Sequence, residues 1–322
     1  MEKIGRTVTP TLDRLIASTT EVDPPLAALD LTALRANAAD LVLRAGGTPV
    51  RVASKSVRCR AVLQVALGEN LTGAGGFRGI MAYSLREAIW LARHGADDIL
   101  MGYPTADRGA LAELAADPEL LNRITLMVDS DDHLDFVLAA AGTTSLRARL
   151  CIDVDASLRL GPVHIGVNSG GTGSLEVSSA DPVVTEVTAG SGLYVPTLFD
   201  KYRAFRPHPS LYFALSAVRR PAPGIATLFG GGYIASGPAG GSRVPTPVWP
   251  PQLKLLRNEG AGEVQTPVTG KPAADLGIGD RVWFRHAKAG ELCERFTEVH
   301  LVESDGSRAV VPTYRGEGQC FG

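Results

Sequence analysis

The sequence has few of the residues that would indicate a disulfide framework, a membrane segment or a nucleic-acid partner. It has four cysteines and no CxxC pair, so we expect reduced thiols rather than disulfides. No apolar run approaches the roughly 20 residues of a membrane helix, and the first residues lack the apolar core of a signal peptide. With 32 basic and 34 acidic residues, the chain has no positive excess to attract nucleic acid. We therefore expect a cytoplasmic protein without a membrane or nucleic-acid partner.

The rest of the composition is that of a globular protein. A hydrophobic fraction of 45% in 322 residues is enough for one large domain or two ordinary ones. Glycine and proline are plentiful, at 36 and 21 residues, and both concentrate after residue 160. This bias favours loops and β-structure in the second half of the chain.

Short apolar strands alternate with helices of about ten residues in the first half of the chain. Seven candidate strands lie near residues 50, 80, 100, 126, 150, 168 and 187. This alternation, without a Rossmann fingerprint, predicts an α/β fold with a TIM-like (β/α) barrel. Such a barrel has eight strands and about 30 residues per repeat. About one strand and two helices are therefore missing from it, between Gly161 and Asn168.

Beyond residue 205 the helical period disappears. Short alternating runs, such as 282–284 and 298–302, stand between Gly/Pro turns and predict a mostly antiparallel β domain. We therefore expect a barrel domain over residues 24–205, a C-terminal β domain over 206–322, and an N-terminal extension over 1–23.

Lys55 ends the first predicted barrel strand, in which Val50 and Val52 alternate. We expect this lysine to be buried. A buried, unpaired ammonium is costly, and a lysine that readily gives up its proton is what Schiff-base chemistry requires. The alternative is a lysine that extends along the barrel rim into water.

Two segments rich in glycine and hydroxyl residues follow the last predicted barrel strands. They comprise Ser169, Gly170, Gly171 and Thr172 in the first, and Gly190, Ser191 and Gly192 in the second. Late barrel loops commonly bind phosphate, because glycines let backbone N–H groups approach the oxygens. Two ordinary turns are the alternative interpretation.

The order and spacing of these motifs resemble those of fold-type III pyridoxal-phosphate enzymes. Alanine racemase is the distant relative. The D-threonine aldolase and D-serine dehydratase group, which includes proteins labelled amino acid deaminase/aldolase, is the closer one. The matching segments are RVASK (51–55), DVDASLRLG (153–161), SGGT (169–172), AGSGLY (189–194) and GDRVW (279–283). The resemblance covers roughly residues 25–205 and, more loosely, 275–315.

This resemblance implies roles for individual residues. Lys55 would be catalytic and hold pyridoxal 5'-phosphate as an internal aldimine, and its freed amine would act as acid or base. The two glycine-rich segments would bind the cofactor phosphate. Arg159 would lie beside the phenolic oxygen of the cofactor, and Tyr202 could contact the phosphate or the ring. A surface arginine and a core tyrosine are the alternatives. The resemblance also allows a homodimer.

A divalent metal is a second implied group. In this family a histidine, followed two positions later by cysteine or aspartate, holds the ion near the substrate hydroxyl. Here His286 is followed by Lys288 at that spacing, and Cys293 lies further along. His286 and Cys293 are the candidate ligands for zinc or manganese. A structural or substrate-site histidine is the alternative.

Together these features predict a pyridoxal-phosphate-dependent lyase whose substrate is a small, β-hydroxy amino acid. It would act by retro-aldol cleavage or by β-elimination with deamination. One alternative is a cofactor-binding pseudoenzyme or inactive truncated variant, since a missing strand would open the edges of the barrel. Another is an amino acid racemase using Tyr233 or Tyr314 as its second base.

Overall fold

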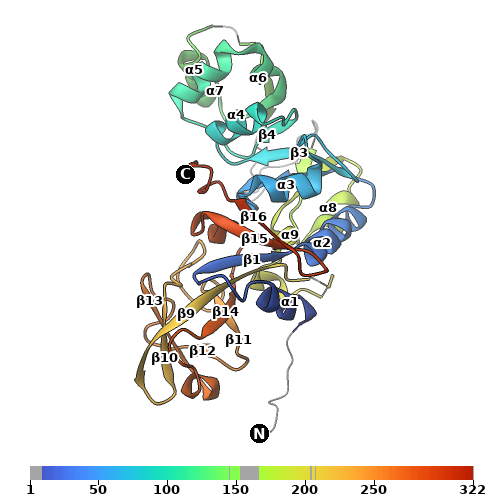
Figure 1. The fold of residues 1–322 in the computed structure, drawn as a ribbon. Coiled ribbons are helices and arrows are strands. Elements are labelled where there is room, and N and C mark those ends of the chain that lie inside the picture. Colours follow the sequence, from blue (N-terminus) through green and yellow to red (C-terminus); the bar gives the residue numbers. More distant parts are fainter. Residues whose placement is uncertain (1–8, 145, 153–166, 204, 207, 322) are drawn as a thin grey trace. The chain divides into compact units, whose positions relative to one another are not determined.

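The computed structural model places the chain in two compact units (Figure 1). The structure describes residues 9–144, 146–152, 167–203, 205–206 and 208–321. Residues 39–190 and 320–322 form one unit, which we call the half-barrel unit. Residues 1–38 and 191–319 form the other, which we call the antiparallel unit. The predicted boundary at residues 205/206 is a different division of the chain and stays a prediction.

A parallel sheet of seven strands organises the half-barrel unit, in the order β6-β5-β4-β3-β2-β8-β7. Its strands are β2 (Val50–Ala53), β3 (Phe77–Ala82), β4 (Ile99–Met101), β5 (Ile124–Val128), β6 (Arg149–Ile152), β7 (Val167–Ser169) and β8 (Val184–Ala189). All seven strands predicted from the sequence are present, and the predicted fold class is confirmed. Runs of β-branched and aliphatic residues give the central strands β2, β4 and β5, which are buried on both faces, whereas the edge strand β6 is largely exposed.

The strand order also locates the missing part of the barrel. β8, the last strand of this sheet in the sequence, pairs with β2, the first. Within the part of the chain that the structure describes, β6 and β7 are the two edges of the sheet. The gap predicted between Gly161 and Asn168 falls between these two edge strands; Gly161 itself lies outside the described residues. An eight-stranded barrel would need its remaining strand at this position.

Helices connect the strands of the half-barrel unit, and α4, α5, α6 and α7 lie together at one end of it (Figure 1). The helices are α2 (Leu31–Arg44), α3 (Arg60–Leu67), α4 (Leu85–Arg93), α5 (Arg108–Ala116), α6 (Pro118–Arg123), α7 (Asp131–Ala140) and α8 (Leu175–Ser179). The predicted capping box is present at α4, where Ser84 Oγ accepts a hydrogen bond from Glu87 N at 3.3 Å. At α2 the cap is Asp30, which accepts from Ala33 N at 2.8 Å, and not Thr32 as the sequence suggested.

The antiparallel unit is built on a nine-stranded sheet. Its strands are β1 (Leu26–Asp30), β9 (Leu211–Ala222), β10 (Ile225–Phe229), β11 (Thr246–Trp249), β12 (Lys254–Leu255), β13 (Gln265–Thr269), β14 (Arg281–Arg285), β15 (Glu298–Val302) and β16 (Arg308–Pro312). β1 pairs antiparallel with β9 and parallel with β15, and the other pairs are antiparallel. The predicted C-terminal β structure is therefore present, and a strand from the start of the chain completes it.

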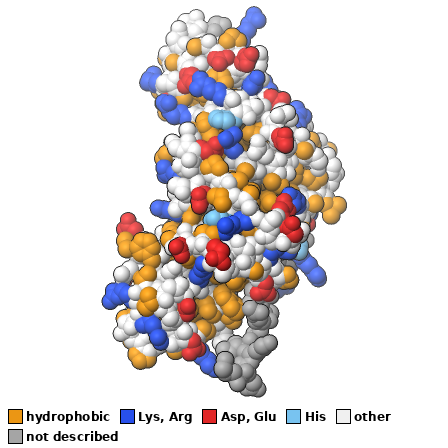
Figure 2. All heavy atoms as spheres, in the orientation of Figure 1, with side chains coloured by type: hydrophobic (Ala, Val, Ile, Leu, Met, Phe, Trp, Pro, Cys, Tyr) orange, Lys and Arg blue, Asp and Glu red, His pale blue; other side chains and the backbone are white. Residues whose placement is uncertain are grey.

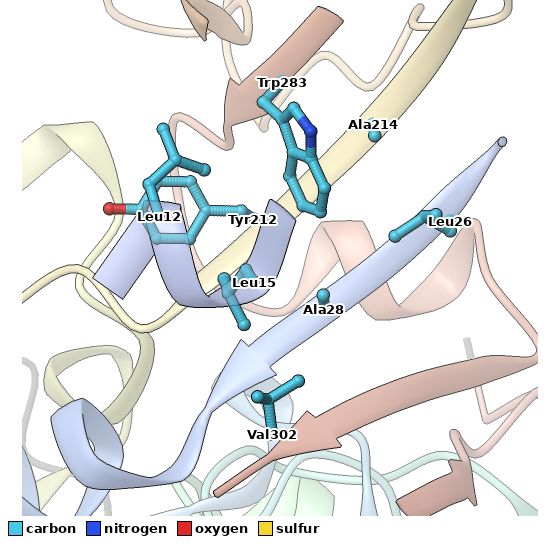
Figure 3. Close-up of a cluster of buried hydrophobic side chains, with 8 residues drawn as sticks. All are labelled: Leu12, Leu15, Leu26, Ala28, Tyr212, Ala214, Trp283 and Val302. Atoms are coloured by element: carbon cyan, nitrogen blue, oxygen red, sulfur yellow. The ribbon is translucent and has the colours of Figure 1, made fainter. Parts of the chain in front are cut away.

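The N-terminal helix α1 (Pro10–Ser18) contributes to the core of this unit. Thr9 caps it, because its Oγ1 accepts a hydrogen bond from Leu12 N at 3.3 Å. The core cluster in Figure 3 joins α1 to four strands and comprises Leu12, Leu15, Leu26, Ala28, Tyr212, Ala214, Trp283 and Val302. Leu12 and Leu15 stand one helical turn apart and so enter the cluster from one face of α1.

Two composition-based expectations can be compared with the structure. All four cysteines lie in described residues, and none of them is disulfide-bonded. Of the helices that the structure describes, none has the length and apolar character needed to span a bilayer. Acidic and basic side chains are interspersed on the face seen in Figure 2, without a large patch of one sign.

Candidate functional site

The carboxyl edge of the parallel sheet gathers several of the predicted site residues. Parallel strands end at one edge, and that edge carries the site in barrel enzymes. Val52 of β2 pairs with Ala189 of β8, so Lys55 and Gly190 follow neighbouring strand ends. Ser169, the last residue of β7, pairs with β8 in turn. Lys55, Gly190 and the segment 169–172 therefore belong to three consecutive strands of the sheet.

Lys55 lies in a 3-10 turn, η1 (Ser54–Ser56), immediately after β2. Ser54 fixes this turn, because its Oγ donates to the carbonyl oxygen of Met81 at 3.0 Å. The Lys55 side chain is exposed, so the expectation of a buried lysine was wrong. The physical reason is the turn: the strand ends at Ala53, and η1 carries the side chain beyond the sheet.

Tyr103 is the partner of Lys55 that the sequence analysis missed. Lys55 Nζ donates a hydrogen bond to Tyr103 Oη. The same nitrogen lies 4.9 Å from the centroid of the Tyr103 ring. Tyr103 stands two residues after the end of a buried strand, β4, and position near a strand end is the signal that could have identified it.

The first glycine-rich segment leaves β7 and leads into α8. Gly170 has φ +89°, which favours glycine, and a Cβ on Gly171 would meet no atom within 4 Å. Thr172 is buried, and its carbonyl oxygen accepts a hydrogen bond from Arg44 Nη2 at 2.6 Å. Arg44 also pairs with Glu176 at 2.5 Å, so the segment is anchored on one side and open at Gly171.

The second segment begins at Gly190, directly after β8. A Cβ at Gly190 would lie 2.5 Å from the carbonyl oxygen of Ala53 and 3.0 Å from Ser56 Cβ. Only glycine lets the end of β8 approach the turn that carries Lys55. Ser191 and Gly192 start the short helix α9 (Ser191–Tyr194) in the antiparallel unit, where Gly192 is buried.

A network of buried charged and polar side chains crosses the strands that end at this edge. Arg51 of β2 binds Glu186 of β8 through two hydrogen bonds, of 2.8 and 2.7 Å, and Asp98 at 3.2 Å. Asn168 of β7 donates to Glu186 Oε1 at 2.6 Å. Thr188 Oγ1 donates to Asn168 Oδ1 at 2.9 Å. The network thus connects β2, β7 and β8 with the residue preceding β4.

The charges in this network stabilise one another. Burial alone raises the pKa of Asp98, but the charge and hydrogen bond of Arg51, with Arg149 and Arg78, lower it below its usual value. Burial lowers the pKa of Arg51, and the hydrogen bond and charge of Glu186 more than reverse this. Gly79 leaves room for the guanidinium, since a Cβ there would lie 2.5 Å from Arg51 Nη1. The sequence analysis quoted Arg51 within a motif and gave it no role.

The two candidate metal ligands lie in the antiparallel unit, and both contact Tyr194. The ring of His286, which follows β14, meets the Tyr194 ring edge-on at 6.3 Å between centroids. Cys293, in the turn η5 (Glu291–Glu294), donates its Sγ–H to Tyr194 Oη at 3.8 Å. His286 is only 2% exposed, and burial and the charge of Arg285 lower its pKa to about 3. The imidazole is therefore neutral at physiological pH.

These surroundings do not fit a divalent metal. Within the described residues, no three His, Cys, Asp or Glu side chains gather in a group that could hold one. The residue two positions after His286 is Lys288, which cannot serve as a ligand while it is an ammonium, and its Nζ donates to Ser236 O and Oγ at 3.3 Å. We derive no role for a metal from His286 and Cys293.

The remaining predicted residues take other positions. Tyr202 is 41% exposed and packs against the Phe199 ring, with 5.3 Å between centroids. Arg159 lies outside the described residues. Tyr314 is 1% exposed, and Tyr233 packs in the same unit against aromatic rings. A role for Tyr233 or Tyr314 as a racemase base stays a prediction.

Comparison with known proteins agrees with this architecture. Residues 29–170 match the family model of the alanine racemase N-terminal domain. D-Threonine aldolase from Filomicrobium marinum superposes with a TM-score of 0.75 at 16% identity, covering 92% of this chain and 96% of that one. D-threo-3-Hydroxyaspartate dehydratase from Delftia sp. HT23 gives 0.68 at 17% identity, covering 91% and 97%. An alanine racemase-like protein from Idiomarina loihiensis gives 0.72 at 13% identity, covering 92% and 98%.

These similarities establish the fold. No curated protein matches the chain. The predicted resemblance is confirmed over residues 29–170 by the family model, and the solved structures share the fold over about nine-tenths of the chain.

Proposed function

We propose that the protein is a pyridoxal-phosphate-dependent lyase that acts on a small β-hydroxy amino acid, with Lys55 as the residue that holds the cofactor. The observation that carries this proposal is the position of Lys55. It extends from the carboxyl edge of a parallel half-barrel, in a chain with the fold of D-threonine aldolase. The strands beside it end in glycine-rich segments.

The residues at this edge fit the cofactor. The Lys55 amine is accessible to an aldehyde. Backbone N–H groups of 170–172 and of Gly190, all in the half-barrel unit, would hold the phosphate, as loops at barrel ends do. When bound, pyridoxal phosphate withdraws electrons from the α-carbon of an attached amino acid. Arg159 beside the phenolic oxygen remains part of the proposal.

The protein's own groups supply the other functions. Lys55 Nζ can hold or release a proton at the carboxyl edge, where general acid–base catalysis would need it. Arg51 and its carboxylate partners fix the strands from which Lys55 and Gly190 extend. The lyase assignment is supported by the similarity in fold to an aldolase and a dehydratase, with TM-scores of 0.75 and 0.68.

Absorbance and trapping with borohydride test cofactor binding. Wild-type protein mixed with pyridoxal phosphate is expected to gain a visible absorption band, and borohydride is expected to fix the cofactor to the chain. Lys55→Ala is expected to lose both, whereas Lys271→Ala, which alters an exposed lysine of the antiparallel unit, is expected to retain both. Equal trapping in Lys55→Ala and wild type would exclude the assignment.

The reaction class needs a separate assay. D-Threonine and D-threo-3-hydroxyaspartate are the substrates named for two of the similar structures. Release of glycine and acetaldehyde from the first would indicate retro-aldol cleavage, and release of ammonia from the second would indicate β-elimination. A chain that binds the cofactor but turns over neither these nor other small β-hydroxy amino acids would contradict the proposed lyase and favour the pseudoenzyme.

A further inference from the structure

Lys55 and Tyr103 come from strands that are separated by a third. Lys55 follows β2, Tyr103 follows β4, and β3 lies between them in the sheet. Both turns are attached to the end of β3. Ser54 Oγ donates to the carbonyl oxygen of Met81, and Gly102 N donates to that of Ala82 at 2.7 Å. The sheet therefore determines where the two side chains meet.

Tyr103 contacts Lys55 in two ways. Its hydroxyl oxygen accepts a hydrogen bond from Nζ, and its ring lies 4.9 Å from the same nitrogen. The hydrogen bond is the contact that carries the argument, because Nζ lies beyond the hydroxyl and donates to its oxygen. Tyr103 is 45% exposed and forms no ring–ring pair with the residues that the structure describes. Its contact with Lys55 is therefore not a by-product of core packing.

We propose that Tyr103 is a positioning residue for Lys55: it holds the Lys55 amine at the carboxyl edge whenever that amine is not bonded to an aldehyde. The hydroxyl orients Nζ by accepting its hydrogen bond. The catalytic meaning of this contact rests on the proposed function. The contact itself exists in the protein without a cofactor and can be tested there.

Reductive methylation measures the availability of each lysine amine. Nζ attacks formaldehyde, water leaves, and cyanoborohydride donates hydride to the resulting carbon–nitrogen double bond. The protein would first be treated with hydroxylamine and dialysed, so that no bound aldehyde occupies Lys55. Proteolysis and mass spectrometry then give the initial rate at each lysine. The chain supplies five internal references, namely Lys3, Lys201, Lys254, Lys271 and Lys288.

Tyr103→Phe keeps the ring and removes the hydroxyl. Nζ that is held by the Tyr103 hydroxyl must leave it before it can attack formaldehyde, so the variant should methylate Lys55 about twofold to fivefold faster relative to the reference lysines. Tyr103→Ala, which also lacks the hydroxyl, should increase the rate at least as much. Tyr83→Phe is the matched control: Tyr83 follows β3 at the same edge, and its ring lies 5.0 Å from the Arg58 guanidinium carbon. It should leave the Lys55 rate unchanged.

The proposal is overturned if Tyr103→Phe leaves the Lys55 rate at the wild-type value, or if all six lysines change together. The outcome is independent of cofactor binding. An unchanged Lys55 rate with normal cofactor trapping would reject the contact and leave the proposed function intact. A faster Lys55 rate with no cofactor trapping would support the contact and reject the proposed function.

Discussion

The two units of the molecule bury polar side chains in opposite ways. In the half-barrel unit the buried Arg51 is surrounded by Glu186 and Asp98, and each charge has a partner of opposite sign. In the antiparallel unit the buried His286 lies against Tyr194 beside the cationic Arg285, and it is kept neutral. The first arrangement holds strand ends that present Lys55. The second is part of a core. Burial of a reactive side chain therefore says little about function until its partners are known.

Removing the charge of Arg51 is expected to have the largest effect on stability. Arg51→Met removes the cation of the half-buried Glu186 and leaves Asp98 paired with Arg78, which should lower the free energy of unfolding by about 3 kcal/mol. Urea denaturation followed by circular dichroism measures it.

Arg35 provides the matched control for that measurement. It pairs with Glu303 through two hydrogen bonds, of 2.7 and 2.8 Å, but its side chain is 54% exposed. Arg35→Ala should cost no more than about 1 kcal/mol. Equal losses in the two variants would show that the buried network is no stronger than a surface pair.

Adding a methyl group at Gly190 is expected to have the next largest effect. Gly190→Ala forces a Cβ to within 2.5 Å of the Ala53 carbonyl oxygen, which should cost up to about 3 kcal/mol and shift the turn that carries Lys55. Gly171→Ala places its Cβ in open space and should change stability by less than about 0.5 kcal/mol. Thermal denaturation would compare the stabilities of the two variants, and borohydride trapping would compare how much cofactor they bind. Equal results for Gly190→Ala and Gly171→Ala would show that the close approach of Gly190 to Ala53 is not required.

Acid should weaken the antiparallel unit through His286. Its folded pKa, lowered to about 3, lies below the unfolded value of about 6.5, so the unfolded chain binds the additional proton between these values. Stability is retained above pH 6.5 and decreases as the pH falls. At pH 5 the loss from this group is about 2 kcal/mol.

The slope of stability against pH in His286→Leu tests that assignment. In His286→Leu, the part of the slope that comes from this histidine should disappear. His94→Gln, at an exposed position, should keep the wild-type slope. An unchanged slope in His286→Leu would mean that other groups cause the acid sensitivity.

Metal removal is expected to have the smallest effect, namely none. The residues around His286 and Cys293 do not fit a divalent ion, so dialysis against a chelator should alter neither stability nor turnover. Lys288→Cys, which puts a thiol two positions after His286, is the variant in which zinc binding would first be sought by elemental analysis. Stoichiometric zinc in the wild-type protein would contradict this account.

Much of the fold could be predicted because its signals are local. β-branched and aliphatic runs identified all seven strands of the half-barrel, and Ser84 with Glu87 marked the start of α4. The α2 cap was misassigned because Asp30 and Thr32 are both good capping residues, and the sequence pattern does not fix the first turn.

The site was less predictable because its contacts are not local. Lys55 and Tyr103 are 48 residues apart, and Arg51 and Glu186 are 135 apart, so no spacing rule joins them. The exposure of Lys55 depends on a three-residue turn that the strand pattern did not show. His286 had the residue type of a metal ligand, and only its surroundings showed that it belongs to the core.

The most direct test of the central proposal is to map the lysine that holds the cofactor. Wild-type protein is mixed with pyridoxal phosphate, reduced with borohydride and digested, and the modified peptide is identified by mass spectrometry. The account predicts one predominant modified site, Lys55. Modification mainly at another lysine, or spread evenly over all six lysines, would contradict it.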